Sequence, residues 1–325
     1  MSGLRSITDG LVVIRTPESG DADLLIAGRD DEFHRFLGPG ADDPCPTGCM
    51  VVGGTVVGWV DFDTERAWLE PGEVNVGYNV FAAHRGLGYA SRAVKLLLHH
   101  LAVGGEHHTA TLLIHPNNTR SLALARRSGF ALHGHLDGNP YWKRAVPPLS
   151  YSDGTVNIRR RDPDDLAMDL AAKDDEQIRW LWQPGEREAW AAMTPHQQQA
   201  HALRDLQEQR DRFGAGPKWT FTIDAASGRG VGYVDCDLAN QNVPRGEANI
   251  SYACHPAYRG RGFVSRAVRL VTRFLADHTG ARTAHIIIDH HNSSSLRVAR
   301  SVQAARREQW TDDLGRTMVR HTLEI

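Results

Sequence analysis

Cysteine, long apolar runs and net charge are all scarce in this chain, and each absence excludes a class of protein. Four cysteines among 325 residues do not make a disulfide framework, so we expect a cytoplasmic protein. No stretch approaches the roughly 18 apolar residues that span a membrane, and the opening MSGLRSITDG lacks the apolar core of a secretory signal. A net charge of −2 gives no bulk attraction to nucleic acid. We therefore expect neither a membrane nor a nucleic acid as a partner.

Metal-binding patterns are incomplete as well. Cys45 and Cys49 have the spacing of half a metal site, but no second pair of ligands stands at the distance that a zinc finger requires. The histidines include three adjacent pairs, His99–His100, His107–His108 and His290–His291. Neighbours on a regular helix or strand do not easily share one ion, because their side chains diverge. We expect no metal.

The most informative feature that is present is an internal duplication. Residues 72–101 read GEVNVGYNVFAAHRGLGYASRAVKLLLHHL, and residues 246–275 read GEANISYACHPAYRGRGFVSRAVRLVTRFL, with 14 of 30 positions identical at an offset of 174. A period of this length indicates a duplicated domain, because solenoid units run about 20–50 residues. We expect one domain over residues 1–146 and a second over residues 155–325, joined by a linker rich in Pro, Ser and Gly at residues 147–154.

Both halves show the same order of expected elements. The paired segments are first strands at 11–15 and 155–159, acidic-start helices at about 19–37 and 162–182, strands at 57–61 and 231–235, repeated strands at 73–80 and 247–254, later strands at 109–114 and 283–289, and helices that begin near 118 and 292. In the repeated strand, Val74, Val76, Tyr78 and Val80 alternate with more polar residues, which indicates one face in the core. The second half has a longer helical insert, with a polar helix at about 194–212.

A glycine-rich turn joins each repeated strand to the helix that follows it. The turns read Arg85-Gly86-Leu87-Gly88-Tyr89-Ala90 and Arg259-Gly260-Arg261-Gly262-Phe263-Val264. Such a turn directs backbone N–H groups to one spot, the helix N-terminus adds about half a positive charge, and glycine lets the backbone approach a ligand. The arginine adds positive charge nearby. The pattern predicts binding of a diphosphate.

The segment from Tyr78 to Ala90 resembles the R/Q-x-x-G-x-G/A acyl-coenzyme A motif of the GNAT superfamily of N-acetyltransferases. The segment from His115 to Ser121, closed by Gly129 and Phe130, resembles the N-x-x-S…G-F signature of the same superfamily. The resemblance covers both halves and is closest to the branch typified by ribosomal-protein N-terminal alanine acetyltransferases. The second copy departs from the motif, because it has Val264 where Gly or Ala is usual and lacks the Gly-Phe ending.

The resemblance implies an α+β fold, with two tandem GNAT-like domains that each have a mixed, mostly antiparallel sheet flanked by helices. The repeated strand would splay from its neighbour, and the pantetheine arm of acetyl-coenzyme A would lie in the gap. Backbone amides at Val80 and Cys254 would polarise the thioester carbonyl. The rest of the implied cofactor site comprises Arg85, Gly86, Gly88, Tyr89, Ala90 and Asn118 in the first half, and Arg259, Gly260, Gly262, Phe263, Val264 and Asn292 in the second.

Catalytic groups are less clearly marked. Many members of the family carry a general-acid tyrosine where this chain has Ala125 and Ala299, so Ser121 and Ser295 become the candidates to protonate the leaving thiolate. Glu73 and Glu247 are repeated carboxylates on the polar strand face. Each could accept the proton of the amine or could cap the strand end.

The family's usual strand glutamate aligns instead with Asn75 and Asn249. Asp61 and Asp235 also repeat, and a structural role is as reasonable for them.

The acceptor side leaves alternatives open. Six tryptophans could wall a pocket or pack in the core: Trp59, Trp68, Trp142, Trp180, Trp182 and Trp190. An acidic cluster in the insert would suit a cationic acceptor or form a solvated helix face: Asp174, Asp175, Glu176, Glu186 and Glu188.

We expect an acetyl-coenzyme A-dependent N-acetyltransferase that acts on a primary amine of a small molecule or peptide. The alternatives are a non-catalytic acyl-coenzyme A-binding regulator or scaffold, and one active domain beside a decayed one. The cofactor turn favours activity in the first half, and the longer insert favours the second.

Overall fold

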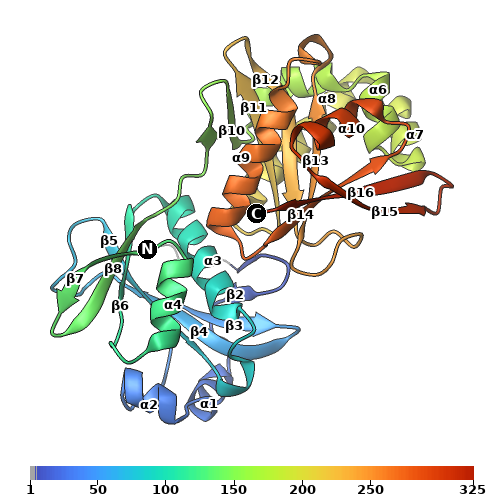
Figure 1. Cartoon of the computed structure of the whole chain (residues 1–325). Coiled ribbons are helices and arrows are strands. Elements are labelled where there is room, and N and C mark those ends of the chain that lie inside the picture. The colour runs from blue at the N-terminus through green and yellow to red at the C-terminus, as the bar shows by residue number, and fades with distance from the viewer. Residues whose placement is uncertain (1–3, 5) are drawn as a thin grey trace. The chain divides into compact units, whose positions relative to one another are not determined.

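The computed structural model describes residue 4 and residues 6–325, and the chain divides into two compact units. Unit 1 ends at Pro148, with Asp277–Gly280 grouped with it, and unit 2 comprises Leu149–Ala276 and Ala281–Ile325 (Figure 1). Over the described residues each unit has one eight-stranded mixed sheet flanked by helices, which confirms the predicted α+β class. The boundaries at 146 and 155 stay a prediction. No helix in the described part of the chain is long and apolar enough to cross a membrane.

The sheet of unit 1 has the strand order β1-β2-β3-β4-β5-β6-β8-β7. Its strands are β1 (Ile7–Thr8), β2 (Val13–Arg15), β3 (Gly48–Val52), β4 (Thr55–Asp63), β5 (Glu73–Val80), β6 (Thr109–Leu113), β7 (Ala131–Leu136) and β8 (Asn139–Ala145). Its helices are α1 (Asp21–Ala27), α2 (Asp31–Leu37), η1 (Ala82–His84), α3 (Tyr89–Gly104) and α4 (Thr119–Arg127). Only the central pair of β5 and β6 is parallel among these described strands.

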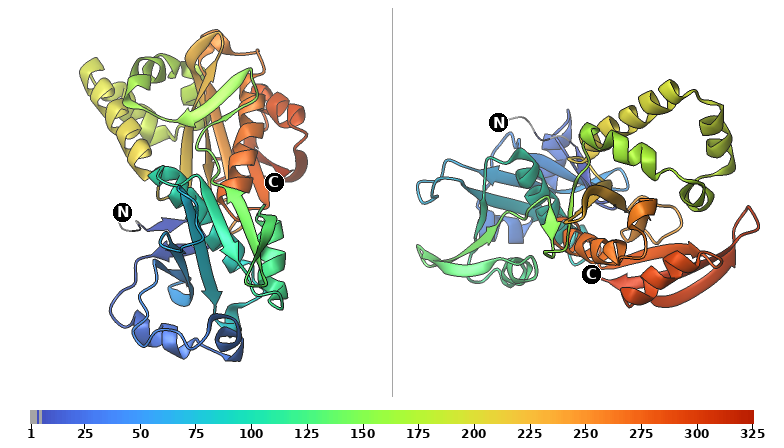
Figure 2. Two further views of the ribbon diagram at one scale, coloured as in Figure 1. Left: turned by 90° about the vertical axis from the view of Figure 1, so that its left-hand side faces the viewer. Right: turned by 90° about the horizontal axis from the view of Figure 1, so that it is seen from above.

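The sheet of unit 2 repeats this order as β9-β10-β11-β12-β13-β14-β16-β15. Its strands are β9 (Tyr151–Ser152), β10 (Val156–Arg160), β11 (Lys218–Ala225), β12 (Gly228–Asp237), β13 (Ala248–Cys254), β14 (Thr283–Asp289), β15 (Ala305–Thr311) and β16 (Thr317–Glu324). Its helices are η2 (Pro163–Asp165), α5 (Leu166–Ala172), α6 (Asp175–Leu181), α7 (Pro184–Ala192), α8 (Pro195–Arg212), η3 (Pro256–Tyr258), α9 (Phe263–His278) and α10 (Ser293–Ser301). Figure 2 shows α9 and the insert helices on opposite faces of this sheet.

The two acidic segments each form more than one helix. A break at Gly28 separates α1 from α2, and Asp30 then caps α2 by accepting a hydrogen bond from the Phe33 N–H at 2.9 Å. Asp174 caps α6 in the same way, with the Gln177 N–H at 2.9 Å. An aspartate in extended backbone geometry satisfies an unpaired amide of the helix start. It therefore begins a new helix.

The helix after each glycine turn packs its apolar stripe against the repeated strand. In unit 1 the fully buried positions of α3 include Ala93, Val94, Leu97 and Leu98. They share one core cluster with β5, of which Val74, Val76 and Val80 are buried. The predicted helical and alternating patterns are therefore both confirmed, and the even-numbered face of β5 is the one toward α3.

The parallel pairing in each sheet is short. The ladder between β5 and β6 covers only Glu73–Asn75, and the ladder between β13 and β14 covers only Ala248 and Asn249. Beyond these residues each repeated strand leaves its parallel neighbour, as the resemblance implies. The free strand edge leads directly to the glycine turn.

Candidate functional site

The backbone of Val80 faces the gap beside β6. The Phe81 N–H donates to the Val57 carbonyl at 2.9 Å, and Gly58 is the register partner of Val80. Hydrogen-bonded and non-hydrogen-bonded pairs alternate in an antiparallel ladder. Because the neighbouring pair of Val57 and Phe81 is hydrogen-bonded, the N–H and carbonyl of Val80 point away from β4.

Unit 2 repeats this arrangement at Cys254. The His255 N–H donates to the Val231 carbonyl at 2.9 Å, and Gly232 is the register partner of Cys254. The backbone groups of Cys254 therefore face the gap beside β14. The side chain of Cys254 is half-buried, and burial raises the pKa of its thiol to about 11.

A glycine opposite each of these positions allows the two strands to approach closely. A methyl group on Gly58 would lie 2.1 Å from the Asn79 carbonyl oxygen, and one on Gly232 would lie 2.3 Å from that of Ala253. These distances are far below van der Waals contact. Any other residue at these positions would push the end of the repeated strand away from β4 or β12 and displace the backbone groups that face the gap.

Arg85 forms a fork that joins the strand end to the start of α2. Its Nε donates to the Val80 carbonyl at 2.9 Å. Its two terminal nitrogens bind Asp30 at 2.6 and 2.9 Å, and one of them also binds Glu32 at 3.1 Å. The hydrogen bond from Arg85 is the main cause that lowers the pKa of Asp30 to about 2. The fork satisfies the carbonyl of Val80 and leaves its N–H as the group that faces the gap.

Arg259 forms the same fork in unit 2. Its Nε donates to the Cys254 carbonyl at 3.2 Å, and its terminal nitrogens bind Asp174 at 2.7 Å and Glu176 at 2.7 Å. Sequence reasoning weighed Asp174 and Glu176 as parts of an acceptor site or of a solvated helix face. The structure instead pairs both with Arg259. The predicted contact of Arg85 and Arg259 with a diphosphate stays a prediction.

A sequence signal for the fork existed and was missed. Residues 30–37 read DDEFHRFL and residues 174–181 read DDEQIRWL, with five of eight positions identical. This second repeat has an offset of 144 instead of 174, because the insert of unit 2 follows it. A search restricted to one offset does not find it.

The glycine turns have the backbone geometry that only glycine adopts readily. Gly86, Gly88, Gly260 and Gly262 have φ between 76° and 82°, and their Cα atoms face open space. Gly88 is the N-cap of α3, and no side chain caps this helix start. The amides that open α3, at Tyr89 and Ala90, are therefore free of a side-chain partner.

Val264 does not crowd the second turn. Its side chain is 9% exposed and belongs to the hydrophobic core of unit 2. The corresponding Ala90 packs against the core of unit 1. The extra methyl groups of Val264 are therefore directed to the core and away from the turn.

Asn118 and Asn292 hold the two candidate serines. The Asn118 Oδ1 accepts from the Ser121 N–H at 3.0 Å, and the Asn292 Oδ1 accepts from the Ser295 N–H at 3.0 Å. Each asparagine thus caps its helix and fixes the serine in the first turn. Contact of these asparagines with a cofactor stays a prediction.

A buried phenol stands beside each serine and was not recognised as a site residue. The Tyr78 hydroxyl is buried and has no well-aligned hydrogen-bond partner among the described residues. Burial raises the pKa of Tyr78 to about 12, and the neighbouring Ser121 opposes that shift. In unit 2 the Tyr252 hydroxyl donates to the Ser295 carbonyl at 3.4 Å, and burial raises the pKa of Tyr252 to about 12. The identity of both tyrosines across the duplication was the available signal.

The structure gives Glu73 and Glu247 other partners. Glu73 binds the Lys143 Nζ at 2.6 Å and accepts from the Tyr141 hydroxyl at 3.0 Å. Burial raises the pKa of Glu73, but these partners outweigh it and lower the pKa overall. At 3.3 Å per residue, Glu73 lies about 23 Å along the strand from Val80. Glu247 pairs with His285 at the corresponding strand start. This geometry favours the structural role at the strand end.

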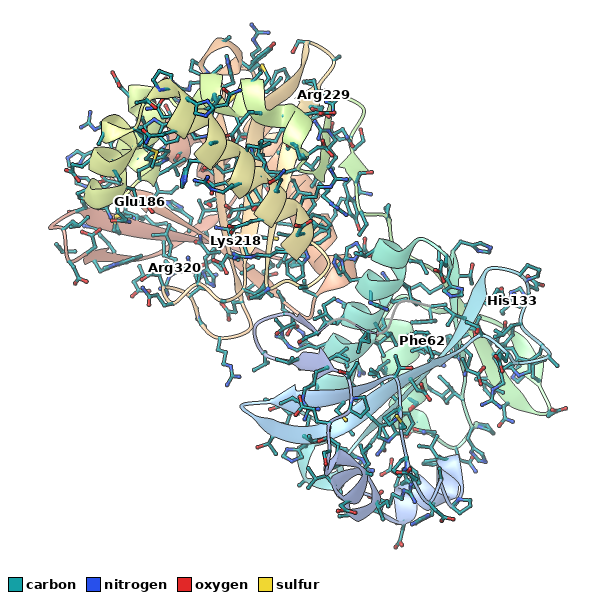
Figure 3. The ribbon with its side chains drawn as sticks, turned by 180° about the vertical axis from the view of Figure 1, so that it is seen from behind. Phe62, His133, Glu186, Lys218, Arg229 and Arg320 are labelled. Carbon is teal, nitrogen blue, oxygen red and sulfur yellow. The ribbon has the colours of Figure 1, made fainter. Side chains whose placement is uncertain are left out.

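Asp61 and Asp235 are also bound by their own sheets. Asp61 accepts from the Thr47 N–H at 3.1 Å and the Thr47 hydroxyl at 2.5 Å. Asp235 accepts from the Ser251 hydroxyl at 2.7 Å and lies 3.5 Å from Lys218 (Figure 3), and burial raises its pKa.

The two units have cavities at different places in the fold. In unit 1 a cavity of about 450 Å³ lies between α2 and the start of α4, lined by Asp31, Glu32, Arg35, Phe36, Asn117, Asn118, Thr119 and Arg120. In unit 2, α5 packs so closely on the strand face that bears Gly232, Tyr233 and Ala253 that a space of only about 10 Å³ remains.

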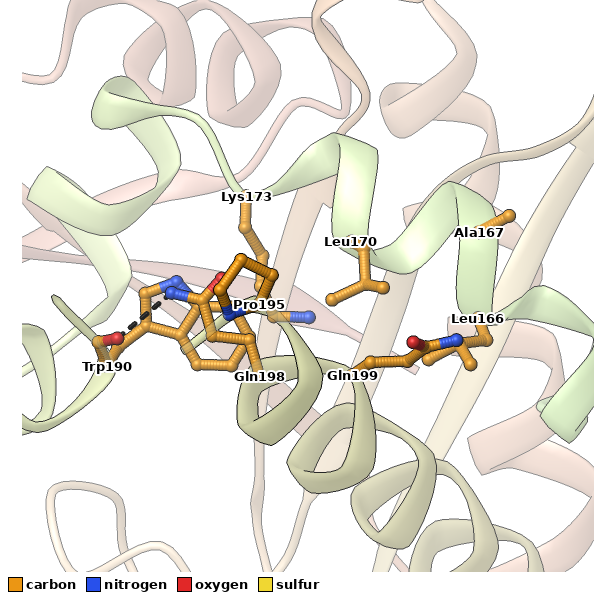
Figure 4. Close-up of a pocket in the computed structure, with 8 residues that line it drawn as sticks. All are labelled: Leu166, Ala167, Leu170, Lys173, Trp190, Pro195, Gln198 and Gln199. Atoms are coloured by element: carbon orange, nitrogen blue, oxygen red, sulfur yellow. Dashed lines mark hydrogen bonds between the residues drawn. The ribbon is translucent and has the colours of Figure 1, made fainter. Parts of the chain in front are cut away.

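A second cavity in unit 2, of about 500 Å³, lies within the helical insert (Figure 4). The Lys173 Nζ lies 5.5 Å from the centre of the Trp190 ring, and the Gln198 side chain donates to the Trp190 carbonyl at 3.0 Å. Trp182 packs edge-on to Trp190 at 5.3 Å.

One adjacent histidine pair does not lie on a regular helix or strand, so its side chains need not diverge. His290 and His291 lie in a turn after β14, where they and Asp289 bring possible ligand atoms within 4.8 Å of one another. Both histidines are exposed, and such a cluster does not by itself establish a metal site.

Comparison with known proteins gives a family match in both units. The acetyltransferase (GNAT) domain family matches residues 41–131 and residues 156–304, which together exceed half of the chain. No curated protein matches.

Similar solved structures include the ribosomal L7/L12 alpha-N-protein acetyltransferase RimL with coenzyme A, at 16% identity and a TM-score of 0.44 over 55% of this chain and 97% of that one. RimJ from Mycobacterium smegmatis with a coenzyme A disulfide has 17% identity and a TM-score of 0.42 over 53% and 82%. The microcin C7 self-immunity acetyltransferase MccE with acetyl-coenzyme A and AMP has 11% identity and a TM-score of 0.42 over 54% and 94%.

The Arg85 fork generates a prediction for stability. Replacing Arg85→Ala should lower the free energy of unfolding by about 2 kcal/mol at pH 7, because charge-assisted hydrogen bonds are lost and two carboxylates remain close together. Urea unfolding followed by circular dichroism measures the change. Arg35→Ala is the control. Arg35 lies on α2 beside the fork and has no ion pair among the described residues, so its loss should change the free energy of unfolding by less than about 0.5 kcal/mol.

The loss of unfolding free energy in Arg85→Ala should depend on pH in a defined direction. The pKa of Asp30 is lowered from 3.8 to about 2 in the folded protein. The stabilisation is therefore complete above about pH 4 and disappears as the pH falls toward 2. A deficit that stays constant over this range would show that the ion pair is not its source.

Proposed function

Because the chain belongs to the acetyltransferase (GNAT) domain family and contains the domain twice, we propose that it transfers an acetyl group from acetyl-coenzyme A to a primary amine of a small molecule or peptide. The observation that carries the proposal is the geometry at Val80. A strand edge there leaves its neighbour, one N–H faces the gap, and a glycine turn with an uncapped helix start follows. This set of donors suits a thioester carbonyl next to a diphosphate.

In the proposed reaction the amine nitrogen attacks the thioester carbon directly. The carbonyl oxygen gains negative charge, and the Val80 N–H stabilises it. As the carbon–sulfur bond breaks, the thiolate takes the proton of the Ser121 hydroxyl, which solvent restores. The new amide loses its extra proton to water, because Glu73 stands too far away to accept it. The diphosphate is held by the amides of Gly86, Gly88, Tyr89 and Ala90.

We place turnover in unit 1. Its cavity of about 450 Å³ borders Asn118 and α2, next to the fork. In unit 2 the space of about 10 Å³ beneath α5 has room for about one water molecule, and the larger cavity of about 500 Å³ lies within the helical insert. Unit 2 keeps its glycine turn and adds Arg261 there, so we propose that it binds acyl-coenzyme A without acetylating an amine.

Substitutions that add a negative charge to each glycine turn test whether turnover occurs in unit 1 while unit 2 only binds the cofactor. Gly88→Asp should weaken binding of acetyl-coenzyme A to unit 1 by at least tenfold and abolish amine-dependent thiol release, because a carboxylate repels the diphosphate. Gly88→Asn is the matched control, since asparagine and aspartate tolerate positive φ similarly and only the charge differs. Gly262→Asp should remove one calorimetric site and leave thiol release unchanged.

Equal effects of Asp and Asn at position 88 would contradict an anion cradle. Loss of turnover with Gly262→Asp instead of Gly88→Asp would assign catalysis to unit 2. No calorimetric site in the wild-type protein would remove the transferase proposal altogether.

The proton donor gives a separate prediction. Ser121→Ala should lower kcat by about 10²-fold, which is the lower range for loss of general acid catalysis, with KM for acetyl-coenzyme A unchanged. Ser295→Ala is the matched control in unit 2 and should leave kcat unaltered. A thiol leaving group more acidic than coenzyme A should recover most of the lost rate, whereas a merely structural defect would not respond to the leaving group.

The carboxylates of the fork, Asp30 and Glu32, are bound by Arg85, and Glu73 lies at the other end of β5, so we propose a reaction without a carboxylate base, which predicts the pH dependence. The pKa of Glu73 lies below its usual 4.5, so this group stays ionised above that pH and adds no change near neutrality. We expect kcat/KM to rise about tenfold per pH unit up to the pKa of the acceptor amine, near 10 for an alkylamine. Steady-state rates between pH 6 and 10 measure this. A plateau that begins near pH 7 would reveal an enzymic base.

A further inference from the structure

The amide of Asn79 is a buried donor without a partner. The residue is 8% exposed, and its Nδ2 is buried without a hydrogen bond among the described residues. Buried polar groups in folded proteins almost always have partners, and an exception calls for an explanation. Asn79 immediately precedes Val80, whose N–H we assign to the thioester carbonyl.

The side chain of Asn79 projects to the strand face opposite α3. The even-numbered residues of β5, including Val80, belong to the core cluster with α3. Side chains alternate along a strand, so Asn79 lies on the other face, where Trp59 is its register partner. The helix α1 packs against β4, and in the proposed reaction the amine approaches the thioester from the face that bears Asn79.

Unit 2 has no equivalent donor. The position that corresponds to Asn79 is Ala253, which borders the small space beneath α5. A polar position further along this face is shared, since Asn75 and Asn249 each have a buried Oδ1 without a partner among the described residues. Of the two units, unit 1 is therefore the one with an unpartnered donor beside the residue whose N–H we assign to the thioester.

We propose, on the basis of the function proposed above, that Asn79 is a specificity-determining residue for the acceptor in unit 1. Its Nδ2 donates to an oxygen on the carbon next to the carbon that bears the amine. The acceptor is then an amine with a neighbouring carbonyl or hydroxyl group, and not a simple alkylamine. A site built around a polar donor rejects an analogue that leaves the donor unpaired.

Three amines of similar size test the assignment: glycinamide, 2-aminoethanol and propylamine. They are compared by thiol release from acetyl-coenzyme A in a Gly262→Asp background, in which unit 2 does not bind the cofactor. We expect glycinamide or 2-aminoethanol, or both, to exceed propylamine in kcat/KM by at least tenfold after correction for amine pKa. The better of the two oxygen-bearing amines identifies a carbonyl or a hydroxyl as the recognised group.

Asn79→Ala should reduce this preference to within about threefold of parity, while propylamine is turned over at nearly the same rate. Asn75→Ala is the matched control, because it removes an asparagine from the same face four residues before Asn79, and it should keep the preference. The melting temperature of ligand-free Asn79→Ala should not fall, since the buried Nδ2 makes no hydrogen bond to any residue that the structure describes.

An unchanged preference in Asn79→Ala would overturn this inference and leave the transferase proposal intact. A fall in melting temperature with an unchanged preference would assign Asn79 a structural role instead. Absence of thiol release with every amine, in the wild-type protein as well, would reject the proposed function and this inference together.

Discussion

The fork of Arg85 is the interaction on which the candidate site of unit 1 depends, and Arg259 repeats it in unit 2. A strand edge that leaves its neighbour exposes a carbonyl together with an N–H, and the carbonyl would repel an oxyanion at the same place. The Nε of Arg85 binds that carbonyl, and the two terminal nitrogens are held by carboxylates of α2. The end of β5 therefore presents the N–H donor of Val80 to the gap, because its carbonyl is already bound by Arg85.

The fork also sets the charge near the turn. Two carboxylates surround one guanidinium, but in unit 1 Glu32 also binds Arg120 at 2.6 Å, so the four charges balance. Unit 2 has Ser294 where unit 1 has Arg120, and it has Arg261 where unit 1 has Leu87. Arg261 donates to the Ala257 carbonyl at 3.2 Å and lies over the Tyr258 ring, so it adds positive charge at the second turn without pairing with Glu176 among the described residues.

Local patterns in the sequence predicted the sheets, the stripe on α3 and the glycine turns, because each depends on residues within a few positions of one another. The fork could not be predicted in this way, since Arg85 and Asp30 are distant in sequence. Alternation placed Glu73 on the polar face correctly, but a period of two says nothing about position along the strand. Glu73 lies at the start of β5, far from Val80. The hydroxyl of Tyr78 was hidden for a related reason, because its ring fits an apolar face and only packing shows what the phenol oxygen meets.

The duplication separates what the fold constrains from what it leaves free. The proposed cofactor side in each unit is built from backbone groups and from residues that fix the backbone: Gly58 or Gly232, the fork and the positive-φ glycines. A side chain at Gly58 or Gly232 would alter the ladder itself. The proposed acceptor side uses the odd-numbered side chains of the same strand, and these can change without disturbing the even-numbered core face. Asn79 in unit 1 and Ala253 in unit 2 occupy such a position. Substitution there changes the chemistry that an acceptor meets while the N–H of the next residue stays in place, so one scaffold can keep its cofactor geometry as its selectivity diverges.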